Sequence, residues 1–400
     1  MATLSPKVSS KLAADIYLVQ NKMDEEIFFE RYASFIKAAS SNVMHAEVGS
    51  RLINTRDAFG VACKGAGDYE NDVFLIFRGS TFANYGADWI SNARIGLEIG
   101  ESDWPVHTGF NHIFKSMLTQ LKDFFASLNG KPRMVHCVGH SLGGAIATLA
   151  SDWVSKKSLS NATKVYTFGA PRPATHLFSK SYTNRLTKNN IYRVYHESDP
   201  VPMIPVFPFC HSPFGNMAYL IHTKPMIWPW DHKMGAYIKS IEAKGRSWAS
   251  LSPTGVHEPT EAQMQQWLES GIKVEPRSTT AWQWVSSALF YVLRKIVGFS
   301  MSKLQATFTG IVTLADSIAL LLQKGLDNDP DDPNGPSGGA SRKGVGYWIT
   351  RLMIKIMQIL GWSSNIKRDN LTRRFMQNAL QRLVEKSHLE ATKAVQTLTV

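Results

Sequence analysis

The residues with the clearest potential for chemistry form the run Gly139-His140-Ser141-Leu142-Gly143-Gly144-Ala145. This run contains the pattern Gly-X-Ser-X-Gly and directly follows the apolar stretch Met134–Val138, which predicts a buried strand. A serine on a sharp strand-to-helix turn adopts a positive φ, and side chains two residues away on either side would collide with that turn. Glycines at 139 and 143 remove the collision. The pattern therefore predicts that Ser141 is a nucleophile.

A serine hydroxyl is a weak nucleophile unless a histidine takes its proton and a carboxylate holds the histidine. Where such a serine turn occurs, the three groups follow the chain order serine, carboxylate, histidine. Asp199 ends the segment that begins with the strand-like run Tyr192–Tyr195, and Pro200 forces an extended or turn conformation just after it. Glu197 is the competing acid, but it lacks the adjacent proline. We favour Asp199.

Five histidines follow Asp199 and could supply the base: His211, His222, His232, His257 and His388. The first lies in a loop rich in Pro and Phe, and the last two lie beyond the part that alternates strands and helices. His222 follows Ala218–Ile221, a predicted strand, which favours a structural role. His232 stands where a loop passes into a predicted helix, so we favour it as the general base and keep His222 as the alternative.

The elements that must position these residues follow an α/β pattern up to about residue 245. Amphipathic helices are predicted over Val8–Gln20 and Phe110–Leu128, alternating with short apolar strands. The predicted strands are Phe59–Cys63, Val73–Phe77, Met134–Gly139, Val165–Gly169 and Tyr192–Tyr195. We expect a hydrolase domain over residues 1–248, a Pro-containing connector over 249–280, and a basic helical domain over 281–400 with a flexible loop at 327–344.

Composition narrows the function further. The 400 residues are 44% apolar and carry a formal net charge of +12, with eleven Lys and Arg against three Asp and Glu after residue 340. Cys63, Cys137 and Cys210 form no CxxC pair, which argues against a disulfide framework and fits a reducing compartment. The N-terminus lacks a secretory signal pattern, so we expect a cytoplasmic origin, with any export by a signal-independent route. No motif calls for a metal or a cofactor.

Taken together, these motifs resemble the class 3 (fungal-type) lipases, a family of α/β-hydrolases. Phe77-Arg78-Gly79-Ser80 looks like the family's oxyanion-strand signature, and Val106–Phe110 like the segment that opens the next helix. The resemblance implies an α/β-hydrolase fold, with a mostly parallel sheet between layers of helices, and a triad of Ser141, Asp199 and His232. It also implies an oxyanion hole made by the backbone amides of Ser80 and Leu142.

The resemblance further implies that a lid follows Ser80, with Phe82, Tyr85, Trp89 and Ile90 contacting acyl chains. Between the acid and the base, the stretch from Ile204 to Trp230 is rich in Pro, Phe, Trp and Met. These residues either pack a core or form an acyl groove or a rim that faces lipid.

The C-terminal region carries a second candidate for lipid contact. Apolar residues at helical spacing are Trp348, Ile349, Leu352, Met353, Ile356, Ile359 and Leu360, and Arg351 and Lys355 lie on the other face. This pattern is typical of a basic interfacial helix, and equally of a helix packed onto the hydrolase or a protein partner such as an inhibitor or delivery protein. Gly310–Leu322 is too short to span a bilayer, which needs about 18 residues. Nucleic-acid binding is not expected, because no recognised binding fold accompanies the basic residues.

The sequence thus predicts a serine carboxylester hydrolase of the lipase or phospholipase A type that acts on lipid, at a membrane surface. A chain with no signal pattern and an appended helical region also resembles antibacterial lipase toxins delivered by specialised secretion. The rival hypothesis is a membrane-binding or membrane-perturbing protein whose C-terminal helices carry the activity on a hydrolase scaffold.

Overall fold

The computed structural model describes residues 3–38, 42–50, 53–80, 96–215, 217–245, 247–251, 254–255, 259–297, 313–329 and 343–399. Its centre is an eight-stranded sheet in the order β1-β2-β3-β6-β7-β9-β11-β12. The five strands from β3 to β11 run parallel, while β1, β2 and β12 pair antiparallel at the two edges. The strands are β1 (Asn42–Ser50), β2 (Ile53–Lys64), β3 (Asp72–Phe77), β6 (Met134–His140), β7 (Thr163–Phe168), β9 (Ile191–His196), β11 (Met217–His222) and β12 (Thr254–Gly255).

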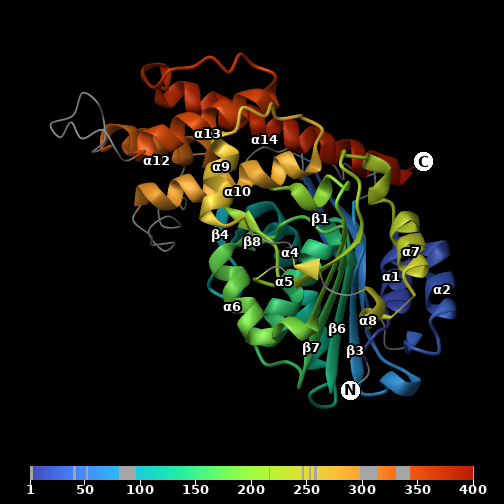
Figure 1. The fold of residues 1–400 in the computed structure, drawn as a ribbon. Helices are drawn as coiled ribbons and strands as arrows, with labels where there is room; N and C mark the ends of the chain where they lie inside the picture. The colour runs from blue at the N-terminus through green and yellow to red at the C-terminus, as the bar shows by residue number, and fades with distance from the viewer. Residues whose placement is uncertain are drawn as a thin grey trace.

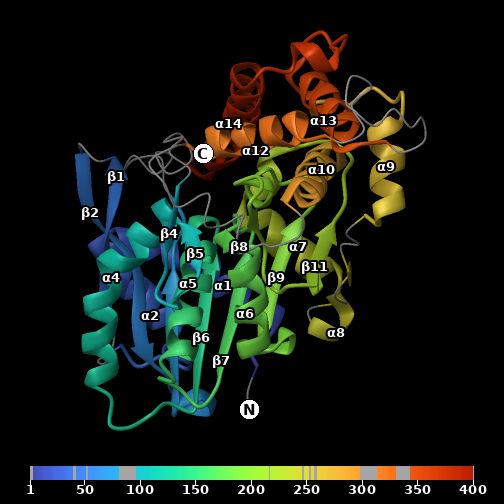
Figure 2. The same cartoon turned by 90° about the vertical axis from the view of Figure 1, so that its left-hand side faces the viewer.

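Helices cover both faces of this sheet, so its central strands are buried on both sides and read as mainly apolar runs. One face carries α1 (Pro6–Asp15), α2 (Lys22–Arg31) and α7 (Met234–Ala243), and the opposite face carries α4 (Thr108–Ala126), α5 (Leu142–Lys156) and α6 (His176–Leu186) (Figures 1 and 2). Every residue of β3, β6, β7 and β9 is buried. The predicted α/β-hydrolase architecture is therefore confirmed.

The predicted elements and the observed ones agree closely where the apolar pattern is long. The opening helix is α1 followed by a 3₁₀ turn over Ile16–Gln20, and the predicted helix at 110–128 is α4. The sequence did not predict β1, β12 or a small second sheet. That sheet is made of β4 (Leu97–Ile99), β5 (Pro105–His107), β8 (Ala174–Thr175) and β10 (Phe209–Cys210). Strands of two or three residues are too short to show an alternating pattern.

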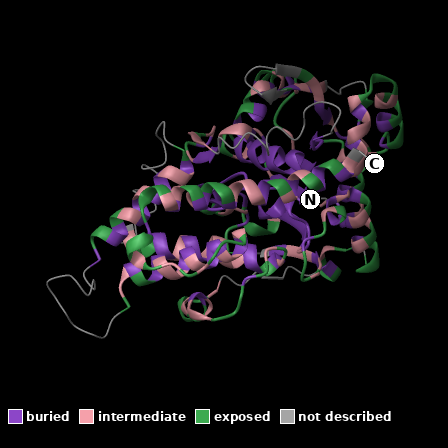
Figure 3. Cartoon of the chain, turned by 90° about the horizontal axis from the view of Figure 1, so that it is seen from above, coloured by how far each residue is buried: buried purple, intermediate pink, exposed green. Residues whose placement is uncertain are grey.

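The C-terminal helices lie together at the carboxyl end of the parallel strands (Figure 1). They are α9 (Glu261–Glu269), α10 (Thr279–Val297), α12 (Leu314–Asp327), α13 (Val345–Leu360) and α14 (Arg373–Gln396), joined to the sheet by the short α8 (Trp248–Leu251). Figure 3 views them from above and shows buried stretches alternating with exposed ones along each helix. One apolar core joins them to Met203, Phe207 and Ile227 from the first part of the chain.

The apolar stripe of α13 belongs to this protein core. Trp348, Leu352 and Ile356 are at most 4% exposed and pack within the helical cluster. On the basic face, Arg351 donates to the carbonyls of Leu268 and Glu269, and Lys355 donates to those of Ser270 and Ile272. Of the two roles that the sequence left open for this stripe, the structure gives helix packing and not an interfacial face. No helix among the described residues is long and apolar enough to cross a membrane.

Candidate active site

Ser141 occupies the turn between β6 and α5, and its backbone is strained, with φ 55° and ψ −131°. The flanking glycines are required by close backbone approaches. A Cβ on Gly139 would lie 2.2 Å from the Gly143 carbonyl oxygen, and a Cβ on Gly143 would lie 2.3 Å from the Phe77 carbonyl oxygen. The predicted positive-φ turn is confirmed. It presents the Ser141 side chain at the end of the sheet and at the N-terminus of α5.

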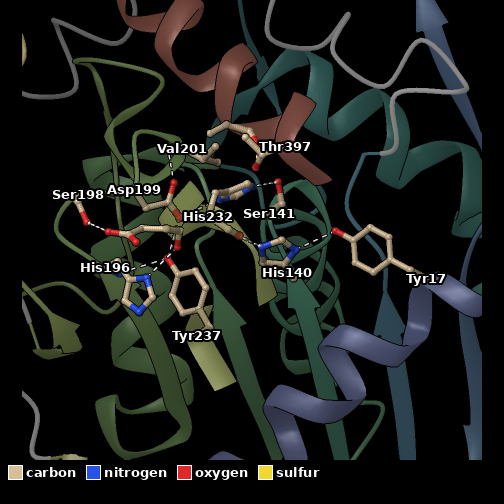
Figure 4. Close-up of polar contacts among 12 residues, drawn as sticks. Tyr17, His140, Ser141, His196, Ser198, Asp199, Val201, His232, Tyr237 and Thr397 are labelled. Carbon is tan, nitrogen blue, oxygen red and sulfur yellow. Dashed lines mark hydrogen bonds and ion pairs between the residues drawn. The ribbon is translucent and has the colours of Figure 1, made fainter. Parts of the chain in front are cut away.

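The structure brings Ser141, Asp199 and His232 into one hydrogen-bonded chain (Figure 4). His232 Nε2 lies 2.9 Å from Ser141 Oγ, and His232 Nδ1 lies 2.8 Å from Asp199 Oδ2. The other Asp199 oxygen accepts from the Val201 amide at 2.9 Å. Because the Asp199 carboxylate can only accept a hydrogen bond, Nδ1 of His232 carries the ring proton. Nε2 is then free to accept from the serine hydroxyl. This tautomer is the one that a general base needs.

The three groups come from separate elements that meet at one edge of the sheet. Asp199 follows the end of β9, and His232 closes a 3₁₀ turn over Pro229–His232 just before α7. The alternatives that the sequence left open lie elsewhere: the backbone amide of Glu197 donates to the carbonyl of His222, and His222 is the last residue of β11. Neither side chain enters the chain of hydrogen bonds around Ser141.

Two residues to which the sequence analysis gave no role lie against the acid. Tyr237 Oη donates to Asp199 Oδ2 over 2.7 Å. Burial raises the pKa of Tyr237 well above 10, so its hydroxyl stays protonated and can only donate to the carboxylate. Beneath them lies Gly169, with φ 56°, where an added Cβ would stand 2.8 Å from Asp199 Oδ2 and 3.2 Å from His232 Nδ1. A glycine at the end of a predicted strand was the available signal for this close approach.

A second pair fixes the backbone of the base. His140 Nε2 lies 2.8 Å from the His232 carbonyl oxygen, and Tyr17 Oη lies 2.8 Å from His140 Nδ1. Burial, with a further contribution from nearby His232, lowers the pKa of His140 well below 6.5, so the ring is neutral. Because a carbonyl only accepts, the single ring proton sits on Nε2, and Tyr17 donates to Nδ1. The tautomer of His140 is thus set from both sides.

The residues predicted for the oxyanion hole lie beside the serine. Ser80 is buried at the end of the segment that follows β3, and Leu142 is the first residue of α5, whose first-turn amides have no partner within the helix. A Cβ on Gly79 would lie 2.9 Å from Ser141 Cβ, which shows how closely the Ser80 segment approaches. The predicted lid residues Phe82, Tyr85, Trp89 and Ile90 fall outside the described residues.

The aromatic stretch before His232 divides between core and surface. Phe207, Phe209 and Ile227 pack into the helical core, whereas Trp228 and Trp230 remain 46% and 45% exposed. Lys233 Nζ lies 4.6 Å from the centroid of the Trp230 ring. The core interpretation therefore holds for one part of this stretch, while the exposed tryptophans stand within four residues of His232.

Parts of the chain are similar to known lipases, to a phospholipase and to a toxin. Residues 74–209 match the family model described as Lipase (class 3). The secreted mono- and diacylglycerol lipase 1 of Fusarium solani is 29% identical over 185 residues, which cover 45% of this chain and 50% of that protein. Phospholipase A(1) DAD1 of Arabidopsis thaliana is 28% identical over 155 residues, 34% of each chain. Toxin TseL of Vibrio cholerae is 36% identical over 101 residues, 25% of this chain and 15% of the toxin. The chain thus spans half the length of the first relative and less of the other two.

Proposed function

We propose that this chain, a member of the class 3 lipase family by its residues 74–209, is a serine hydrolase that cleaves the acyl ester bonds of lipids. One observation carries the proposal: a single imidazole, that of His232, lies 2.9 Å from the Ser141 hydroxyl and 2.8 Å from the Asp199 carboxylate. These are hydrogen-bond distances for a nucleophile, its base and the group that orients the base.

The reaction is acyl transfer in two halves. Ser141 Oγ attacks the ester carbonyl carbon while His232 Nε2 takes its proton, and Asp199 stabilises the imidazolium that forms. The tetrahedral intermediate collapses when His232 returns that proton to the departing alcohol, leaving an acyl group on Ser141. Water then attacks the acyl carbon with His232 again as base, and the fatty acid leaves as Ser141 is reprotonated.

The negative oxygen of each intermediate needs donors that are already in position. We assign this role to the backbone amides of Ser80 and Leu142, and removing one such donor typically costs about 10²–10³ in rate. Support comes from the position of Leu142 in the first turn of α5, where the helix dipole favours negative charge.

The proposed substrates are acylglycerols or phospholipids, and the proposed site of action is a membrane surface. The names of two relatives, a mono- and diacylglycerol lipase and a phospholipase A1, support a lipid acyl ester as the scissile group. Exposed Trp228 and Trp230 beside His232 support an interfacial site of action, because amphipathic indole rings favour the membrane–water boundary. The segment shared with Toxin TseL supports a role as a lipase toxin.

The test is product analysis by mass spectrometry after incubation with mixed phospholipid and triacylglycerol. We expect the wild-type chain to release fatty acid and Ser141→Ala to release none above background. Ser151→Ala is the matched control, because Ser151 is buried in the same helix α5 but bonds to Tyr182 away from the site. If Ser141→Ala released fatty acid at the wild-type rate, the proposed function would be wrong.

The same experiment separates the rival function. If the C-terminal helices perturb membranes without any chemistry, the wild type and Ser141→Ala should release dye from vesicles to the same extent. The burial of the α13 stripe within the protein core argues against that rival. Leakage that requires Ser141 would assign the effect to ester hydrolysis.

A further inference from the structure

The last helix of the chain has two parts with different partners. The first part of α14, with Met376, Ala379 and Leu383, packs into the core of the C-terminal helices. The end of α14 and the 3₁₀ turn Thr397–Thr399 instead pack on the hydrolase part. There Ala391, Ala394, Val395 and Leu398 form a separate apolar cluster with Val201 and Ile204. We refer to Ala391–Thr399 as the C-terminal cover.

The partners of the C-terminal cover flank the proposed catalytic groups. Val201 follows Asp199 by two residues, and its amide binds the Asp199 carboxylate. The turn Pro229–His232, which carries the proposed base, contacts both α14 and the turn Thr397–Thr399. Figure 4 shows the end of the last helix lying over Ser141 and His232, with Thr397 on the same side as the serine hydroxyl.

The proposed catalytic groups are closed to solvent in this arrangement. Ser141, Asp199 and His232 each have an exposed fraction of 0%. An ester carbonyl must come within about 3–3.5 Å of Ser141 Oγ before the serine can attack. A lipid therefore reaches the serine only after a covering segment moves.

We propose that the C-terminal cover is an autoinhibitory element that must leave the face formed by Val201 and Ile204 before substrate binds. This inference rests on the proposed function of Ser141. The anchored first part of α14 keeps the cover close to the site, so it closes again without a second molecule. The contacts of the cover are mostly two alanines and a valine, which bury little apolar area and make release inexpensive compared with unfolding the helical core.

The test uses the full chain with a charge placed on the inner face of the cover. Val395→Asp puts a carboxylate into the apolar cluster with Val201 and Ile204, which favours the open arrangement. Leu389→Asp is the matched control, because it introduces the same charge on the same helix at a side chain that is 55% exposed. Neither residue belongs to the proposed catalytic machinery.

Two measurements are made on each variant: kcat/KM on a soluble short-chain ester, and hydrogen exchange of the amides in 391–399. We expect Val395→Asp to raise kcat/KM by about tenfold or more and to lose amide protection in the cover. Leu389→Asp should match the wild type in both. Loss of protection in Val395→Asp with an unchanged kcat/KM would overturn the proposal.

The outcomes distinguish this inference from the proposed function. If the wild type is active and Val395→Asp loses amide protection without a gain in kcat/KM, the autoinhibitory role of the cover is contradicted and the proposed function is not. If neither the wild type nor Val395→Asp hydrolyses the ester, although the cover of the variant has lost its amide protection, the proposed role of Ser141 is contradicted. If Val395→Asp does not fold, Val395→Ala removes two methyl groups without adding charge and should give a smaller gain in the same direction.

Discussion

Tyr237 donates its phenolic proton to Oδ2 of Asp199 over 2.7 Å. The same oxygen lies 2.8 Å from Nδ1 of His232, so one carboxylate oxygen receives two donors. Both side chains are fully buried, where a hydrogen bond to a charged group is stronger than in water. The tyrosine therefore orients the acid, and the acid in turn orients the base.

Tyr237→Phe removes this hydrogen bond while keeping the aromatic ring. We expect kcat on a soluble ester to fall about tenfold with little change in KM, since a hydrogen bond to a charged group contributes about 1.5–3 kcal/mol. Tyr219→Phe is the control, because Tyr219 lies on β11 and its ring packs against Tyr192 and Trp248 away from the triad. A larger rise in KM than fall in kcat would show that Tyr237 serves binding instead of orientation.

Gly169→Ala should disrupt the triad itself. Besides the strained φ of 56°, the new methyl group would stand 2.8 Å from Asp199 Oδ2 and 2.9 Å from Tyr237 Oη. Displacing the acid by about 1 Å should lower kcat by about 10²-fold.

Gly130→Ala is a matched control for the backbone cost. Gly130 has φ 100°, and an added Cβ there would meet nothing within 4 Å. We expect this variant to lose about 1 kcal/mol of stability in urea unfolding and to keep its turnover. Equal turnover by the two glycine variants would contradict the close approach described at Gly169.

The stability of the protein should fall as the solution becomes acidic. Burial, reinforced by nearby His388, lowers the pKa of His107 to about 3, and burial lowers the pKa of His136 and His211 below 6.5. In the unfolded chain each of these rings takes up a proton near pH 6.5. Because the unfolded state binds more protons between pH 6.5 and about 3, the free energy of unfolding should decrease as pH falls through that window.

Urea unfolding at pH 7.5, 6.5, 5.5 and 4.5 measures this dependence. His107→Gln removes one buried imidazole. Once the stability that this variant loses at pH 7.5 is subtracted, its free energy of unfolding should fall less steeply with decreasing pH than that of the wild type. His112→Gln is the control, since the His112 side chain is 56% exposed. A free energy of unfolding that stays constant over this range would contradict the burial of these rings as neutral groups.

The turn that carries Ser141, the acid Asp199 and the base His232 were predictable because each leaves a local signal in the sequence. Gly139 and Gly143 mark the turn, Pro200 marks the stop after Asp199, and His232 stands at a loop-to-helix junction. Chain order restricts the base to the five histidines after Asp199, and their local context selects among them. The geometry that joins these residues comes from the parallel sheet, whose strand ends meet at one edge.

Other parts of the site left no such mark. The contact between Tyr237 and Asp199 depends on the register of α7 against β9, which a helical pattern does not specify. The stripe of α13 has the same spacing whether lipid or protein covers it, and only the packing of α9, α10 and α14 decides between them. The approach of Val395 to Val201 joins residues almost 200 positions apart through a small, mostly alanine surface, and nothing local signals it.

The central claim is that the hydroxyl of Ser141 is a nucleophile activated by His232. A fluorophosphonate tests it directly, because an activated serine displaces fluoride from phosphorus and keeps the phosphonyl group, which peptide mass spectrometry locates. After incubation to completion, we predict one adduct per wild-type chain, on Ser141, and none on Ser141→Ala or His232→Ala. An adduct on another residue, or equal labelling of Ser141 in His232→Ala, would contradict the account.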